Sequence, residues 1–233
     1  MLDDLRHRLG TVAQERDWRE LWPAHGVDNG DTPLDFDAIF GRQAPVTLEI
    51  GFGNGETLVA LASAHPERNF FGLEVHPPGV GHLLLRCEAE GLHNVRVICD
   101  DAVQVLQRRV SDASLDELLL YFPDPWPKKR HHKRRIVQPA FVELVARKLR
   151  PGGVLRMATD WQPYAEHMLA TANACAALRN MAASGAFVDR PDSRPVAPSL
   201  RPSPSATKTS TVRPTCFFAS SHAMSSTRPT SRW

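Results

Sequence analysis

The segment VTLEIGFGNGETLVALASAH, residues 46–65, decides the fold that this sequence predicts. It opens with a short apolar run, which is typical of a buried strand when a turn signal follows it. Gly51, Gly53 and Gly55 permit a tight turn and a close approach of the backbone to a ligand. The part from residue 56 onward is amphipathic, as a helix requires. The segment therefore predicts a strand, a tight turn and a helix.

The same alternation occurs four more times along the chain. The further apolar runs are NFFGLEVH, VRVICDD, LDELLLYF and VLRMATDW, and an amphipathic stretch follows each of them. Five strand–helix repeats predict an α/β protein with a doubly wound, mostly parallel, Rossmann-like sheet and helices on both faces. In such sheets ligands bind beyond the carboxyl ends of the strands, so the residues that end each strand are candidates for a site.

Length and composition fit one domain of this kind. The chain has 233 residues, of which 42% are hydrophobic and 23% charged, as in ordinary globular proteins. Its first residues, MLDDLRHRLG, do not form a secretory signal, and no apolar run reaches the roughly 20 residues that span a bilayer. The four cysteines show no metal-ligand spacing. We expect a cytoplasmic protein with no membrane contact and no metal, either a monomer or a homodimer.

Composition divides the chain into three parts. Residues 1–44 form a polar lead-in, and residues 45–196 contain the five strand–helix repeats. From residue 197 onward Ser, Thr, Pro, Ala and Arg dominate, and the only apolar cluster is CFF at 216–218. Such a segment buries too little apolar surface to offset the entropy lost on ordering. We therefore expect residues 197–233 to be disordered and the sheet to lack a C-terminal strand.

Acidic residues end the first three predicted strands, at Glu49, Glu74 and the pair Asp100 and Asp101. An acid at the end of the second strand can accept hydrogen bonds from both ribose hydroxyls of a nucleotide-like ligand. Glu56 occupies the place where a pyrophosphate would rest on the helix N-terminus, so phosphate is disfavoured there. S-adenosylmethionine is a cationic nucleoside without phosphates and fits this pattern. Each acid taken alone is more typical of a solvated strand end or a helix cap, so this prediction depends on all of them together.

The segment YFPDPWPKKRHHKRR, residues 121–135, joins a proline-rich acidic loop to a dense run of positive charge. Its prolines fix their own φ angles and restrict the residues before them, so Asp124 is held in place. Asp124 follows the fourth strand and Asp160 follows the fifth, which brings two more carboxylates to the same crevice. If the substrate is a guanine, its N7 has a lone pair, and the carboxylates need only orient the base and stabilise positive charge. An Asx-type turn is the structural alternative for Asp124.

The basic run favours contact with phosphate groups, which attract Lys and Arg without sequence preference. A solvated charged loop is the simpler alternative. His131 and His132 lie within this run but lack partners at metal-ligand spacing, so they do not indicate a metal site.

Taken together, these segments resemble one family. LEIGFGNGE, GLEVHPPGVG, CDDAV, YFPDPWPKKRHHKRR and ATDW are similar to segments of the bacterial tRNA (guanine-N7-)-methyltransferases, over about residues 18–196. The resemblance implies methyl transfer from S-adenosylmethionine to N7 of the variable-loop guanine, position 46, of tRNA. It implies cofactor contacts by Glu49, Glu74, Asp101 and Asp124, a catalytic role for Asp124, substrate contacts by Lys128 and Asp160, and RNA contacts by Arg130, His131, His132, Lys133, Arg134 and Arg135.

The resemblance ends near residue 197. The family has a T-x-x-E substrate motif and then a Gly/Trp-containing strand, where this chain has APSL at 197–200. The chain also lacks the basic segment that the family has near its N-terminus. A change of reading frame in a GC-rich gene would produce such a tail. Two other functions therefore stay open: an RNA-binding protein that binds the cofactor with weak or no turnover, and a nicotinamide-dependent oxidoreductase, against which Glu56 argues.

Overall fold

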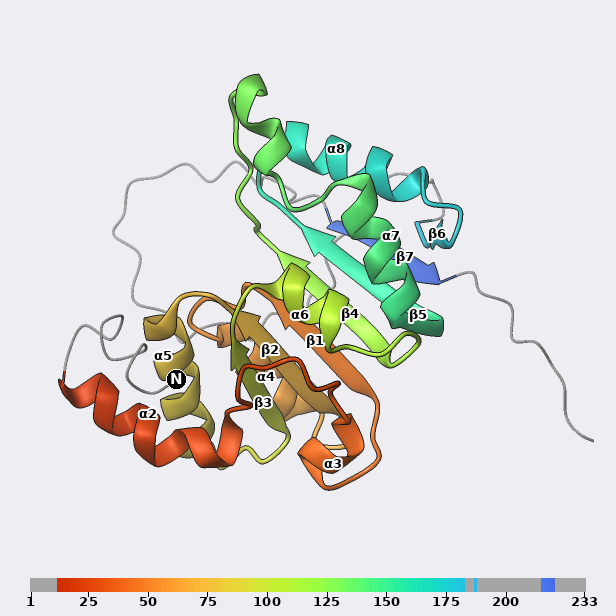
Figure 1. Cartoon of the computed structure of the whole chain (residues 1–233). Coiled ribbons are helices and arrows are strands. Elements are labelled where there is room, and N and C mark those ends of the chain that lie inside the picture. Colours follow the sequence, from red (N-terminus) through yellow and green to blue (C-terminus); the bar gives the residue numbers. More distant parts are fainter. Residues whose placement is uncertain (1–11, 183–186, 188–214, 221–233) are drawn as a thin grey trace, which may run out of the picture.

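The computed structural model describes residues 12–182, 187 and 215–220. Its centre is a seven-stranded sheet in the order β3-β2-β1-β4-β5-β7-β6 (Figure 1). The strands are β1 (Val46–Ile50), β2 (Asn69–Glu74), β3 (Val95–Cys99), β4 (Leu115–Tyr121), β5 (Leu149–Ala158), β6 (Leu178–Asn180) and β7 (Thr215–Ser220). The strands β3, β2, β1, β4 and β5 pair with one another in parallel, and β7 is antiparallel to both β5 and β6. The prediction of a doubly wound, mostly parallel sheet is confirmed.

Helices cover both faces of the sheet and form two separate cores with it. They are α2 (Val12–His25), α3 (Phe36–Phe40), α4 (Glu56–Ala64), α5 (Pro77–Ala89), α6 (Ala102–Arg108), the 3-10 helix η1 (Lys129–Arg134), α7 (Pro139–Lys148) and α8 (Gln162–Asn173).

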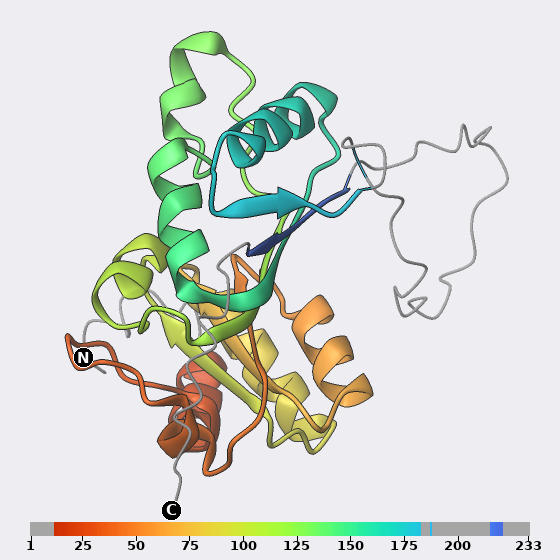
Figure 2. The same ribbon diagram turned by 90° about the vertical axis from the view of Figure 1, so that its right-hand side faces the viewer.

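The residues of β2 show how the two cores are separated. Phe70 and Phe71 are adjacent in this strand but belong to different hydrophobic clusters, because successive side chains of a strand point to opposite faces. Phe71 lies in the cluster that contains residues of α3, α6, α7 and α8, whereas Phe70 lies with residues of α2, α4 and α5. Figure 2 shows α7 (green) and α4 (orange) on opposite sides of the sheet.

Part of the polar lead-in belongs to the second core. Trp18 is 1% exposed and stacks on Trp22, with 4.5 Å between the ring centroids. After α2 the chain runs along β3, where the amide of Val27 donates a hydrogen bond to the carbonyl of Val97 at 2.8 Å. This contact covers backbone groups at the outer edge of β3 that could otherwise form hydrogen bonds with a strand of another molecule.

The expectation that the sheet lacks a C-terminal strand is corrected by β7. This strand lies between β5 and β6, with Phe218 opposite Leu155 on one side and Ala219 opposite Arg179 on the other. A short segment can order here without a core of its own, because neighbouring strands supply backbone partners along both of its edges. The rest of the predicted tail, residues 197–214 and 221–233, lies outside the described residues.

We predict that β7 contributes measurably to stability. A version of the chain that ends at residue 214 loses both ladders of β7, and we expect its melting temperature to fall by about 4–8 °C, which corresponds to about 2 kcal/mol for a protein of this size. Differential scanning calorimetry measures the difference. A version that ends at residue 220 keeps β7 and serves as the control. Equal melting temperatures for the two versions would show that β7 adds nothing to the sheet.

Candidate active site

Three acids that the sequence assigns to cofactor binding end neighbouring strands at one edge of the sheet. The parallel register aligns Ile50 of β1 with Leu73 of β2. It also aligns Glu74 of β2 with Cys99 of β3. Glu49, Glu74 and Asp101 therefore come from the carboxyl ends of β1, β2 and β3, where ligands bind in doubly wound sheets.

The glycine-rich turn after β1 borders this edge. Gly51, Gly53 and Gly55 have φ angles of 67°, 59° and 77°, which side chains rarely tolerate. A Cβ atom built on Gly51 or Gly53 would meet nothing within 4 Å, so the backbone of the turn faces open space. A Cβ atom on Gly79 of α5 would lie 2.3 Å from the carbonyl oxygen of Gly53. Gly79 thus lets α5 approach the turn closely. The sequence reasoning missed this role, and the signal that could have indicated it is the glycine that directly follows two prolines at the start of α5.

Glu74 ties the glycine turn to the end of β2. Its Oε2 accepts a hydrogen bond from the amide of Gly53 at 2.9 Å. Its Oε1 accepts from the amides of Val75 and His76 at 2.8 and 3.1 Å. The sequence predicts a ribose contact for this residue. The structure adds a second role, because the carboxylate holds the turn in place through backbone amides.

Glu49 is the acid whose environment most favours a ligand. It is 3% exposed, and burial, together with the negative charge of Glu74, raises the pKa of its carboxyl to about 8. Its Oε2 accepts no hydrogen bond from the residues that the structure describes. A buried carboxyl oxygen without a partner is costly unless another group satisfies it. The residues at this edge therefore fit a cationic ligand that also brings hydrogen-bond donors.

Asp101 is exposed and acts as the N-cap of α6. Its Oδ1 accepts a hydrogen bond from the amide of Gln104 at 2.9 Å, and its own amide donates to Oδ1 of Asp100 at 2.7 Å. The helix cap considered from the sequence is thus present, and the carboxylate keeps acceptor capacity on its other oxygen. Asn29, which the sequence reasoning missed, reaches the same edge and donates from Nδ2 to the carbonyl of Cys99 at 3.2 Å.

The loop after β4 carries Asp124 in a strained backbone. Phe122 and Trp126 have φ angles of 52° and 41°, which are unusual for residues other than glycine. The amide of Phe122 donates to the carbonyl of Ala158 at 2.8 Å, so the loop begins as an extension of the β4–β5 ladder. Asp124 and Asp160 are both exposed, and they follow the aligned ends of β4 and β5. The structure thus brings these two acids to the same edge as the first three.

The basic run forms η1, with Lys128 as its N-cap residue. Its exposed cations are Lys128, Lys129, Arg130, Lys133 and Arg134. The guanidinium of Arg134 lies over the ring of Trp126 at 5.0 Å from the centroid, and the half-buried His131 meets the same ring edge-on. Arg135 differs from the other basic residues, because only 4% of it is exposed.

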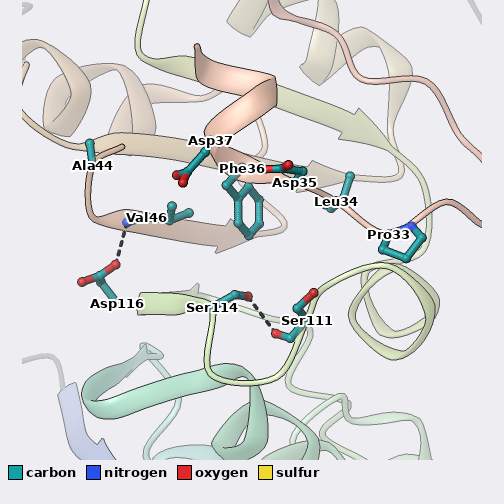
Figure 3. Close-up of a pocket in the computed structure, with 10 residues that line it drawn as sticks. All are labelled: Pro33, Leu34, Asp35, Phe36, Asp37, Ala44, Val46, Ser111, Ser114 and Asp116. Carbon is teal, nitrogen blue, oxygen red and sulfur yellow. Dashed lines mark hydrogen bonds between the residues drawn. The ribbon is translucent and has the colours of Figure 1, made fainter. Parts of the chain in front are cut away.

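A separate hollow of about 430 Å³ lies at the opposite end of the strands (Figure 3). Its three acids all have partners within the chain. Asp35 caps α3, and Asp37 accepts a hydrogen bond from the side chain of Gln43. Asp116 accepts from the amide of Val46, as the dashed line in Figure 3 shows, and pairs with Arg150. The partners of these acids are thus a helix start, a side chain of the same segment and the start of β1, whereas the candidate active site lies at the carboxyl ends of the strands.

Among the residues that the structure describes, no group of three or more His, Cys, Asp or Glu side chains is arranged to hold a metal ion. The described helices include none that is long and apolar enough to cross a membrane.

Comparisons with known proteins identify relatives of this chain. A family model described as a putative methyltransferase matches residues 43–199. The tRNA (guanine-N(7)-)-methyltransferase of Sodalis glossinidius is 57% identical over 186 residues, which cover 80% of this chain and 78% of the relative. The protein of the same name from Pseudomonas aeruginosa is 59% identical over 186 residues, or 80% of this chain and 76% of the relative.

Among solved structures, a SAM-dependent O-methyltransferase from Thermotoga maritima has a TM-score of 0.52 at 14% sequence identity, covering 82% of this chain and 68% of its own. This likeness supports the fold alone. The sequence relatives show the family as well as the fold, because their alignments cover 80% of this chain and more than half of the aligned residues are identical. The chain therefore belongs to the tRNA (guanine-N(7)-)-methyltransferase family.

Proposed function

We propose that the protein transfers a methyl group from S-adenosylmethionine to N7 of a variable-loop guanine in tRNA. The observation that carries the proposal is the buried Glu49 carboxyl with an unpartnered oxygen, beside Glu74 and at the edge of the sheet where this family's fold binds ligands. A tRNA substrate would place this activity in the cytoplasm.

The cofactor would lie along the carboxyl ends of the first three strands. Glu49, Glu74 and Asp101 supply carboxylate acceptors there, and Gly51 and Gly53 leave space beside the backbone. Glu56 stands in the first turn of α4, where the pyrophosphate of a dinucleotide would otherwise rest. These features favour a cationic nucleoside over a nicotinamide dinucleotide.

The chemical step would need orientation more than proton transfer. When bound, S-adenosylmethionine would supply a methyl group attached to a positively charged sulfonium sulfur. Guanine N7 has a lone pair that could accept the methyl group without prior loss of a proton, and the methylated base would carry positive charge. Asp124 and Asp160 carry exposed carboxylates at the same edge, where they can orient the base and stabilise that charge. Lys128 follows Asp124 closely and would contact the substrate.

The exposed cations of η1 would bind the tRNA backbone. Arg130, Lys133 and Arg134 lie on one short helix directly after the loop that carries Asp124. Contacts between such cations and phosphates provide affinity and orientation without reading the base sequence. The affinity for tRNA and the choice of guanine are therefore expected to depend on different residues.

A second function deserves a test, because residues 197–200 read APSL where the family has T-x-x-E. The chain would then bind the cofactor and tRNA with weak or no turnover. A missing contact to a buried base costs about 1–3 kcal/mol, which corresponds to roughly a tenfold to hundredfold loss of rate.

Methyl transfer from labelled S-adenosylmethionine to a tRNA transcript distinguishes the two functions. We expect slow transfer to the unmodified transcript, and none to a matched transcript with 7-deazaguanine at the target position, because that base has no N7 lone pair. Binding of both transcripts without transfer to either would favour the second function. Equal methylation of the two transcripts would exclude guanine N7 as the acceptor.

We also predict that cofactor binding depends on pH through Glu49. Below about pH 8 its raised pKa keeps the unliganded carboxyl protonated, and a cationic ligand favours the ionised form. The affinity for S-adenosylmethionine should therefore rise as the pH increases from 6 to 8, by at most about tenfold per unit. Isothermal titration calorimetry at several pH values measures this. Glu49→Gln should remove the dependence, and S-adenosylhomocysteine, which has no sulfonium charge, should show little of it. The same slope in Glu49→Gln as in the parent chain would contradict the assignment.

The role of η1 predicts a change in the salt dependence of tRNA binding. Lys133→Ala should weaken binding and reduce the slope of log affinity against log salt concentration by up to about 0.9, because one phosphate contact is lost. Filter binding at several salt concentrations gives the slope. An unchanged slope would return the basic run to the simpler interpretation of a solvated loop.

A further inference from the structure

Arg135 ends the basic run, but its surroundings differ from those of the cations before it. Arg134 is exposed, whereas Arg135 is 4% exposed although it is adjacent in sequence. A side chain that contacts phosphates must be accessible to them. The structure therefore separates Arg135 from the RNA contacts that the sequence assigns to residues 130–135.

The Arg135 guanidinium joins three elements around the candidate active site. Its Nε donates a hydrogen bond to the carbonyl of Pro125 at 2.9 Å, in the loop after β4. Its Nη2 lies 3.1 Å from Nε2 of His132 in η1. Its Cζ lies over the ring of Tyr164 in α8, 4.7 Å from the ring centroid. These three partners are an imidazole, a backbone carbonyl and an aromatic ring, and none of them is a phosphate-like anion.

The partners of Arg135 are themselves fixed. Tyr164 is fully buried in the core that includes α7 and α8. The side-chain amide of Gln138 donates to the carbonyls of His132 and Arg135 at 3.0 and 3.3 Å, so it holds the end of η1. To reach a phosphate, the guanidinium would have to leave a charged hydrogen bond and a desolvated cation–π contact together.

The loop that Arg135 holds is the strained one. Pro125 directly follows Asp124, and the positive φ angles of Phe122 and Trp126 lie on either side of them. A strained backbone persists only where the surrounding structure fixes it more firmly than local preference would. The hydrogen bond from Arg135 to the carbonyl of Pro125 is such a restraint, at the centre of the loop.

We propose that Arg135 is a positioning residue that fixes the Asp124 loop against α8, and that it does not contact tRNA. The expected effect of Arg135 on methyl transfer rests on the proposed function. The expected effect of Arg135 on the loop after β4 does not. Lysine cannot replace this side chain, because an ammonium group offers neither the planar stacking face nor the forked donors of a guanidinium.

The test compares Arg135→Ala and Arg135→Lys with Lys133→Ala as the matched control in the same run. Three quantities are measured on the full chain: methyl transfer at saturating tRNA, the salt slope of tRNA binding, and hydrogen exchange at the amides of the loop after β4. Circular dichroism confirms that each variant is folded. If Arg135→Ala does not fold, Arg135→Lys provides the same comparison.

For both Arg135 variants we expect loop amides to exchange at least about tenfold faster, kcat to fall about a hundredfold, and the salt slope to stay unchanged. Added methylguanidine should restore part of the rate of Arg135→Ala. Lys133→Ala should reduce the salt slope and leave the exchange of the loop unchanged. If Arg135→Ala reduces the salt slope as Lys133→Ala does and leaves loop exchange unchanged, the proposal is wrong. If the parent chain transfers no methyl group, the proposed function fails, whereas the exchange and salt data still decide the role of Arg135.

Discussion

The hydrogen bonds that the Glu74 carboxylate accepts from backbone amides are the interaction on which the rest of the site depends. They attach the glycine turn after β1 to the end of β2, so two strand ends become one rigid edge. The same negative charge adds to the burial that raises the pKa of Glu49 to about 8. Glu74 thus fixes the turn, and its negative charge makes ionisation of the neighbouring Glu49 less favourable unless a cation lies beside it. A positively charged ligand at this edge would satisfy Glu49 without disturbing the bonds of Glu74.

The two loops of the site obtain unusual backbone geometry in different ways. The turn after β1 has glycine wherever φ is positive, so its shape carries little strain. The loop after β4 has Phe122 and Trp126 in that region, and its shape therefore depends on tertiary restraints. Large side chains at these positions can interact with their surroundings as glycine cannot, as Trp126 does with Arg134 and His131.

The features that sequence reasoning predicted depend on residues close together in the chain. Apolar runs ended by an acid or a glycine turn predict strands, and parallel pairing then brings Glu49, Glu74 and Asp124 to one edge. The features that it missed depend on distant partners. Arg135 is buried because Tyr164 and the carbonyl of Pro125 surround it, and charge density alone assigned it to the surface with its neighbours. Likewise, β7 orders because β5 and β6 supply its backbone partners, which the composition of the tail does not show.

The position of β7 in the sheet has a consequence for the order in which the protein is built. β6 precedes β7 in the chain, but among the described strands it pairs with β7 alone, which lies between β5 and β6. On the ribosome, the five parallel strands can pair as they emerge, whereas β6 must wait beside an uncovered β5 until residues 215–220 have been synthesised. Until then the backbone groups along that edge of β5 lack the partners that β7 supplies, and an unpaired strand edge can pair with another strand.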